Sequence, residues 1–128
     1  MYRVAIVDDN ELWCLVLETS LRHQGFMVST FTNAHSFLEV ADQFDLALVD
    51  FSMPTRPFQK ELDGSRVIAE LKSRLEKPPT LILTSAYFTD QVLPLAHEIC
   101  PEADVCLSKS TCLEEIIETV KHCVTSSA

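Results

Sequence analysis

Residues 3–9, with the sequence RVAIVDD, join a short apolar run directly to two aspartates. Residues 46–50, LALVD, repeat this arrangement with one aspartate. Two later apolar runs end in Thr84 and Lys109. If the four runs are parallel strands, their polar ends meet at one edge of the same sheet. The sequence therefore predicts a site of three carboxylates, a hydroxyl and an ammonium group, which suits a hard divalent cation and a phosphoryl group.

Strand-like and helix-like segments alternate along the chain. We expect strands at residues 2–7, 27–31, 45–50, 80–84 and 105–108. We expect helices over residues 10–24, from Asn33 to Ala41, from Asp63 to Leu75, over 89–100 and from Thr111 to Val124. This alternation predicts an α/β fold, in which helices cover both faces of a parallel sheet and right-handed crossovers give a doubly wound domain.

We expect a five-stranded parallel sheet of the flavodoxin-like type, with strand order 2-1-3-4-5, which is one of the common orders of doubly wound folds. In this order strands 1 and 3 are neighbours, and ligands bind beyond their carboxyl ends, where the winding direction changes. Asp8 and Asp9 follow the first strand, and Asp50 ends the third. The three acidic residues are therefore expected at the binding crevice.

Local signals mark several helix ends. Asn33 is a suitable N-cap for the second helix, and residues 111–114, Thr-x-x-Glu, form a capping box for the last helix. Pro94 lies inside the segment 89–100, so this helix either begins near Gln91 or is kinked.

Composition and charge limit the function classes. The chain has 128 residues, 47% hydrophobic and 23% charged, which suits one globular domain. We expect this domain to span residues 1–124, with 125–128 as a tail or the start of a linker. A formal net charge of -9 argues against direct binding to nucleic acid. The sequence lacks a membrane-length apolar run and a signal-peptide pattern, so we expect a cytoplasmic location and no membrane partner.

Three carboxylates in one place repel one another, and a bound Mg²⁺ ion would remove that repulsion. Mg²⁺ prefers octahedral oxygen ligands and is usually bound through one or two carboxylates together with waters and phosphate oxygens. A carboxylate can also attack phosphorus to form an aspartyl phosphate. Lys109 would supply a positive charge and Thr84 a hydroxyl donor to the phosphoryl oxygens.

The chain resembles the response-regulator receiver domains of two-component signalling, a family that includes the bacterial chemotaxis regulator. The matching segments are IVDD at 6–9, VDFSMP at 49–54, DG at 63–64, LTS at 83–85 and SK at 108–109. A pair of aspartates, or a threonine after a strand, is a weak signal by itself. The ordered set is specific, because it spreads over nearly the whole chain.

The resemblance implies a metal site and a phosphorylation site that share one residue. Asp50 would accept the phosphoryl group and also bind Mg²⁺. Asp9 would bind Mg²⁺ directly and Asp8 largely through water, with the backbone carbonyl of Ser52 as a further ligand.

The resemblance also implies how the domain is used. Thr84 would contact the phosphoryl group and reorient with it, and Lys109 would pair with Asp50 or its phosphate.

Such a domain is not an enzyme for other substrates, because it catalyses only its own phosphorylation and dephosphorylation. The donor would be a sensor histidine kinase or a phosphotransfer protein, and the output would pass to a downstream protein or a fused effector domain. The face formed by residues 89–124 would carry the output, with a homodimer as one form of it.

The sequence departs from the family pattern at three places. Residues 55–62 lengthen the loop between the third strand and the third helix. Ser110 follows Lys109 where the family has proline in a cis bond, so this bond is either trans or strained. Cys106 stands on the fifth strand where the family has an aromatic residue.

Two other function classes fit parts of the sequence. A pseudo-receiver would use the same fold for protein binding without taking phosphate, and Cys106, Ser110 and the long loop favour it. The intact acidic cluster argues against it.

An enzyme on a related fold is the other class. A flavin carrier needs a phosphate-cradling first loop, whereas residues 8–11, DDNE, would repel phosphate. A phosphatase of the haloacid dehalogenase type would have a second acid where Ser52 stands.

Overall fold

The computed structural model describes residues 2–52, 63–89 and 91–126 of the chain. The strands are β1 (Arg3–Val7), β2 (Met27–Phe31), β3 (Leu46–Asp50), β4 (Thr80–Ser85) and β5 (Val105–Ser108). The helices are α1 (Glu11–His23), α2 (Ala34–Leu38), α3 (Gly64–Arg74), α4 (Ala96–Ile99) and α5 (Leu113–Ser126), with short 3-10 helices η1 (Ala41–Gln43) and η2 (Leu93–Leu95). All neighbouring strands pair in parallel, in the predicted order β2-β1-β3-β4-β5.

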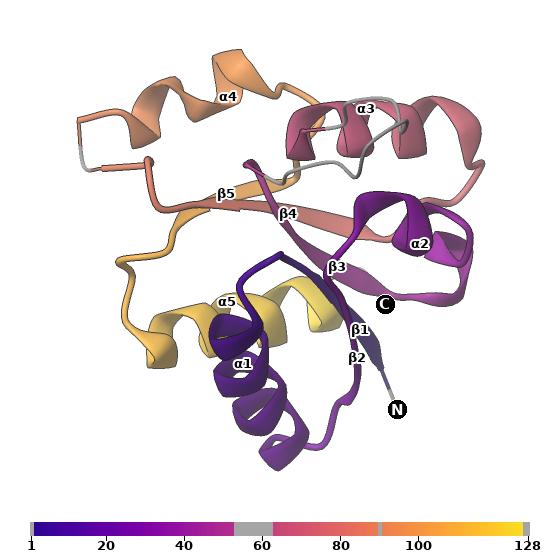
Figure 1. The fold of residues 1–128 in the computed structure, drawn as a ribbon, viewed down its shortest axis with the longest axis vertical. Coiled ribbons are helices and arrows are strands. Elements are labelled where there is room, and N and C mark those ends of the chain that lie inside the picture. The colour runs from indigo at the N-terminus through magenta and orange to yellow at the C-terminus, as the bar shows by residue number, and fades with distance from the viewer. Residues whose placement is uncertain (1, 53–62, 90, 127–128) are drawn as a thin grey trace.

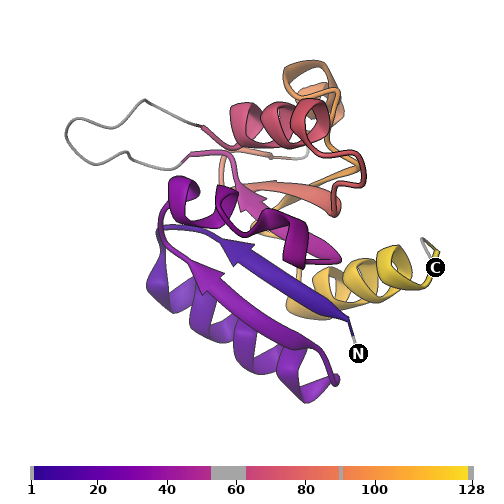
Figure 2. The ribbon, with the colours of Figure 1, turned by 90° about the vertical axis from the view of Figure 1, so that its right-hand side faces the viewer.

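Helices cover both faces of the sheet, as Figures 1 and 2 show. α1 and α5 lie on one face, and α2, α3 and α4 lie on the other. Each face has its own buried apolar cluster. One cluster includes Phe37 and Ile68, and the other includes Leu17 and Val120. The predicted doubly wound α/β fold is therefore confirmed.

The central strand β3 is buried along its whole length. All five of its residues are buried, whereas the edge strand β2 has three exposed or half-buried positions after its buried Val28. A strand covered on both faces needs a continuous apolar run, which residues 46–49 supply. Asp50, the last residue of β3, is therefore held at the carboxyl end of a strand that is packed from both sides.

A glycine ends α1. Gly25 has a φ of 96°, a conformation that glycine adopts without steric cost. Its N–H donates to the Arg22 carbonyl at 3.0 Å, and the Phe26 N–H donates to the Leu21 carbonyl at 3.2 Å. These two bonds form a Schellman motif, which turns the chain from α1 into β2.

The second helix is capped as predicted but is shorter. The side chain of Asn33 accepts hydrogen bonds from the N–H groups of His35 at 2.9 Å and Ser36 at 3.2 Å. α2 ends at Leu38, and Ala41, which was expected on the same helix, begins η1.

The segment between β4 and β5 is less helical than the sequence predicts. In place of one helix over 89–100, the structure has η2 followed by the four-residue α4. Pro94 lies in the first turn of η2, where the absence of an N–H donor has no cost. The prediction of one helix beginning near Gln91 is wrong, because the helical residues begin at Leu93, where Pro94 fits the first turn, and form two short turns, η2 and α4.

The last helix also differs from its predicted bounds. The Cys112 carbonyl accepts the Ile116 N–H at 3.1 Å, so Cys112 rather than Thr111 caps the helix. The predicted capping box is therefore wrong. α5 continues through Ser126, so residues 125–126, expected in a tail, are helical.

Two further sequence expectations concern the segment 55–62 and membrane-spanning helices. The lengthened loop at 55–62 lies outside the residues that the structure describes. In the described ranges, no helix combines the length and the hydropathy that crossing a bilayer requires.

Candidate functional site

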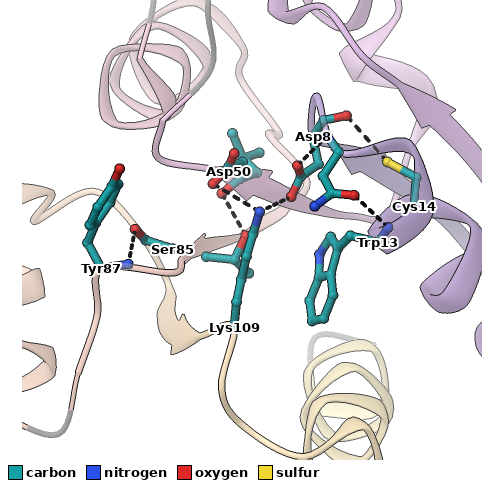
Figure 3. A network of polar contacts seen from close by, with 10 residues as sticks. Asp8, Trp13, Cys14, Asp50, Ser85, Tyr87 and Lys109 are labelled. Carbon is teal, nitrogen blue, oxygen red and sulfur yellow. Dashed lines mark hydrogen bonds and ion pairs between the residues drawn. The ribbon is translucent and has the colours of Figure 1, made fainter.

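The polar ends of four strands meet at one edge of the sheet, as the sequence predicts. Asp8 follows β1, Asp50 ends β3 and Lys109 follows β5 (Figure 3). Thr84 on β4 is the register partner of Asp50. Asp8, Asp50 and Thr84 are buried, and Asp9 is exposed. This edge therefore holds the three carboxylates, the hydroxyl and the ammonium group together.

The ammonium group of Lys109 lies between two buried carboxylates. Its Nζ is 2.6 Å from Asp8 Oδ2 and 3.5 Å from Asp50 Oδ1. Side-chain exposure is 16% for Lys109, 2% for Asp8 and 6% for Asp50, so all three charges are largely removed from water. Buried charges are stable when they are paired. One lysine here compensates two buried carboxylates, and an excess of negative charge remains.

Burial, together with the excess negative charge, changes the acidity of the site. Burial, with the nearby Asp8 carboxylate, raises the pKa of Asp50 from 3.8 to about 7, against the opposing effects of Lys109 and the Ser52 N–H. Burial lowers the pKa of Lys109, but its contacts with Asp8 and Asp50 outweigh this effect and leave that pKa raised. Lys109 is therefore charged at neutral pH, where Asp50 titrates.

The acidic residues fit a divalent cation. One carboxylate oxygen from each of Asp8, Asp9 and Asp50 lies within 4.8 Å of the others. Asp8 Oδ2 is buried and, within the described parts of the chain, has no hydrogen-bond partner beyond its ion pair with Lys109. Carboxylate oxygens are the ligands that Mg²⁺ prefers. The donor set and its spacing therefore suit Mg²⁺.

Hydrogen bonds fix the acidic turn after β1. The Asp8 N–H donates to the Phe31 carbonyl at 2.9 Å, and the Asn10 N–H donates to Asp8 Oδ1 at 2.9 Å. Asn10 in turn caps α1, because its side-chain Oδ1 accepts the backbone N–H of Trp13 at 3.0 Å. One carboxylate oxygen of Asp8 is thus used by the backbone, and the other faces Lys109.

The turn after β3 depends on a close approach of α3. Asp63 caps α3 by accepting the Arg66 N–H at 2.9 Å, and the Gly64 N–H donates to the Phe51 carbonyl at 2.9 Å. A methyl group on Gly64 would collide with the backbone of Asp50 and Phe51. Gly64 is therefore needed because a side chain has no room beside the end of β3.

Replacing Gly64 with alanine is expected to destabilise the domain by roughly 1–3 kcal/mol, since the added methyl group meets main-chain atoms that cannot rotate away. Urea unfolding would measure the loss. Ser73→Ala, at an exposed position on the same helix, is the control and should change stability little. Equal stability of Gly64→Ala and the wild type would contradict the close approach.

Hydrogen bonds between serines hold the loop that carries Lys109. The Lys109–Ser110 peptide bond is trans, which is the first of the two alternatives left open by the sequence. Ser108 Oγ lies 2.6 Å from Ser110 Oγ and accepts the Ser110 N–H at 3.1 Å. The Lys109 N–H donates to the Ser85 carbonyl at 3.0 Å. These bonds connect the loop to β4 and β5.

Two aromatic features near the site are not apparent from the sequence. Phe88 is buried against Phe51, with ring centroids 6.0 Å apart, whereas Tyr87 is 71% exposed. The ring centroid of Trp13 lies 5.7 Å from Lys109 Nζ. Trp13 lies in the first turn of α1, just after the acidic turn, but no pattern in the sequence pairs it with Lys109.

The strand order, the acidic crevice and the buried lysine together define the class of protein as an α/β domain of the flavodoxin-like fold with an acidic site at the carboxyl end of its sheet. The family model of the response regulator receiver domain matches residues 4–121. The chain belongs to this family, whose members act in two-component signalling.

Relatives and solved structures agree with this membership. The chain is 32% identical over 84 residues to the transcriptional regulatory protein ZraR of Klebsiella oxytoca, with 64% of this chain and 18% of the relative covered. It is 30% identical over 87 residues to PcoR of Escherichia coli, with 66% and 36% covered. The chain thus spans well under half the length of these curated relatives. The response regulator TrrA of Thermotoga maritima, solved in complex with Mg(2+)-BeF, has a TM-score of 0.77 and 26% identity, with 96% of this chain and 99% of that chain covered.

Proposed function

We propose that this receiver domain accepts a phosphoryl group on Asp50 from a phosphohistidine, and that phosphorylation changes its binding to a partner. The main support is the position of the Asp50 carboxylate. It is buried at the end of β3, close to Asp8 and Asp9, and lies 3.5 Å from the ammonium group of Lys109.

The acidic cluster and a relative both support Mg²⁺ as the cofactor. Asp8, Asp9, Asp50 and the backbone carbonyl of Ser52 would hold the ion. When bound, Mg²⁺ supplies positive charge that offsets the charge on the carboxylates and on the phosphoryl oxygens. The complex of TrrA with Mg(2+)-BeF supports the same cofactor for this chain.

The proposed transfer forms one bond to phosphorus and breaks another. An oxygen of Asp50 forms a P–O bond while the P–N bond to the donor histidine breaks, and the electron pair of that bond returns to the imidazole. Lys109 would pair with the phosphoryl oxygens. The Thr84 hydroxyl, now 3.4 Å from the Val49 carbonyl, would turn toward them. Positioning and charge compensation supply most of the catalysis in such transfers.

The partners follow from this chemistry. The donor is a sensor histidine kinase or a phosphotransfer protein, and the output goes to a downstream protein or a fused effector domain. We assign the output surface to the face of residues 89–124, where a homodimer would also form. The receiver unit is residues 1–124, and a cytoplasmic location fits this role.

The test is the intact mass of the protein after incubation with acetyl phosphate, with and without Mg²⁺. We expect a phosphate adduct on the wild type in the presence of Mg²⁺, and none on Asp50→Asn, because the amide oxygen is a poor nucleophile. An adduct of equal yield on Asp50→Asn would contradict Asp50 as the acceptor.

Mg²⁺ is expected to raise the thermal midpoint of the wild type. A ligand that binds the folded state alone stabilises it by about 1–3 kcal/mol at ten to a hundred times its Kd. Asp9→Asn should remove most of this effect. Asp9 is exposed and is not paired with Lys109, so its loss should disturb the fold little. A midpoint that Mg²⁺ does not change in the wild type would instead support the pseudo-receiver.

A further inference from the structure

The indole ring of Trp13 lies beside the ammonium group that the proposed function assigns to the phosphoryl group. Lys109 Nζ is 5.7 Å from the ring centroid, within the range in which the negative face of an aromatic ring attracts a cation. Figure 3 shows the indole from α1 next to the Lys109 side chain, which extends from the loop after β5 toward Asp8 and Asp50. Trp13 is half-buried, and the Lys109 side chain beside it is 16% exposed.

Trp13 belongs to a closed circuit of contacts around Asp8. Asp8 Oδ1 accepts the backbone N–H of Asn10 at 2.9 Å, and Asn10 Oδ1 accepts the backbone N–H of Trp13 at 3.0 Å. The Trp13 ring contacts Lys109, and Lys109 Nζ returns to Asp8 Oδ2 at 2.6 Å. The placement of the indole is thus tied to the same carboxylate that holds the lysine. A rotamer change of Trp13 would break one side of this circuit.

The distances from the Lys109 ammonium group to Asp8 and Asp50 indicate how the Trp13 ring would act. Lys109 is 0.9 Å closer to Asp8 than to Asp50, since the two distances are 2.6 Å and 3.5 Å. To act at Asp50, the ammonium group must weaken its contact with Asp8 without leaving the crevice. Lysine has four rotatable bonds, and extended rotamers toward water compete with the crevice position. An aromatic face attracts the cation whether or not Asp8 is paired with it, so it disfavours those rotamers throughout the shift.

We propose that Trp13 is a positioning residue that keeps the Lys109 ammonium group in the crevice and thereby increases the rate of phosphorylation at Asp50. This role rests on the proposed function, because it concerns the reaction at Asp50. It is separate from the packing of α1, since an aliphatic side chain such as leucine can pack against apolar neighbours but does not attract a cation.

A thermodynamic cycle tests the contact without any phosphoryl donor. Urea unfolding of the wild type, Trp13→Leu, Lys109→Met and the double variant would give the coupling between the two side chains. We expect the Trp13→Leu effect on the unfolding equilibrium constant to be about 2- to 30-fold larger when Lys109 is present than when it is absent. Additive effects would overturn the proposal.

Phosphorylation rates with acetyl phosphate and Mg²⁺ test the consequence. Trp13→Leu should lower the maximum rate by about 2- to 30-fold and leave the half-saturating donor concentration unchanged. Trp13→Phe should recover most of the rate, because its ring keeps an aromatic face toward Lys109. Leu12→Ala, at the adjacent and 70% exposed position, is the control and should match the wild type.

The outcomes separate this role from the proposed function. Equal rates for the wild type and Trp13→Leu would overturn the positioning role alone. Equally low rates for Trp13→Leu and Trp13→Phe would also overturn it, since size rather than aromatic character would then decide the rate. A wild type that forms no adduct at all would overturn both.

Discussion

Replacing Lys109 with methionine should destabilise the domain by roughly 2–4 kcal/mol at about pH 8, because two buried carboxylates then lose their cation. The loss should be smaller at about pH 6. Asp50, whose pKa is about 7, then takes up a proton and leaves less uncompensated charge. Urea unfolding at the two pH values measures both effects.

The control for this variant is another ion-paired lysine. Lys72 lies 3.0 Å from Asp104, but the side chains are 29% and 40% exposed. Exposed pairs contribute little to stability, so Lys72→Met should cost about 1 kcal/mol or less and should show little change with pH. Equal losses for the two methionine variants, or a Lys109→Met loss that does not change with pH, would contradict the charge balance that we describe.

Asp50→Asn is expected to stabilise the metal-free protein at about pH 8, on the order of 1–3 kcal/mol. The folded protein holds the pKa of Asp50 at about 7, against 3.8 as its ordinary value. Between these values the folded state binds more protons than the unfolded state. The contribution of Asp50 to the free energy of unfolding is therefore fully present below about pH 4 and is lost as the pH rises through about 7. Asparagine removes this pH-dependent loss.

The measurement is the difference in unfolding free energy between Asp50→Asn and the wild type, in the presence of a chelator, from acid to mildly alkaline pH. The difference should be small at low pH, where Asp50 is neutral, and should rise to a plateau above about pH 7. Asp42→Asn, which removes an exposed carboxylate on η1, should show no such rise. If the difference in unfolding free energy between Asp50→Asn and the wild type did not change with pH, the raised pKa of Asp50 in the folded state would be contradicted.

The sheet and its polar edge could be predicted from the sequence because each strand is an apolar run that ends in a chemically distinct residue. The run before Asp50 has no alternation, which indicates burial on both faces, and its position in the order places it beside the run before Asp8. The register of β3 and β4 then brings Thr84 opposite Asp50. These features depend on local sequence and on chain topology alone.

The parts that could not be predicted depend on side-chain direction and on the depth of burial. Spacing alone does not decide whether Lys109 pairs more closely with Asp8 or Asp50, or how far the pKa of Asp50 rises. The place of Trp13 beside Lys109 joins residues far apart in the sequence through two loops. The short α4 was missed because Pro94 allowed several helix starts, and tertiary packing selects among them.

The central claim is that Asp50 itself carries the phosphoryl group, and the most direct measurement is chemical mapping of the acyl phosphate. Protein treated with acetyl phosphate and Mg²⁺ would be reduced with borohydride, which converts an aspartyl phosphate to homoserine, then digested and sequenced by mass spectrometry. We predict homoserine at position 50, dependent on Mg²⁺ and absent from untreated protein. Homoserine at position 8 or 9 with aspartate intact at position 50 would contradict the claim.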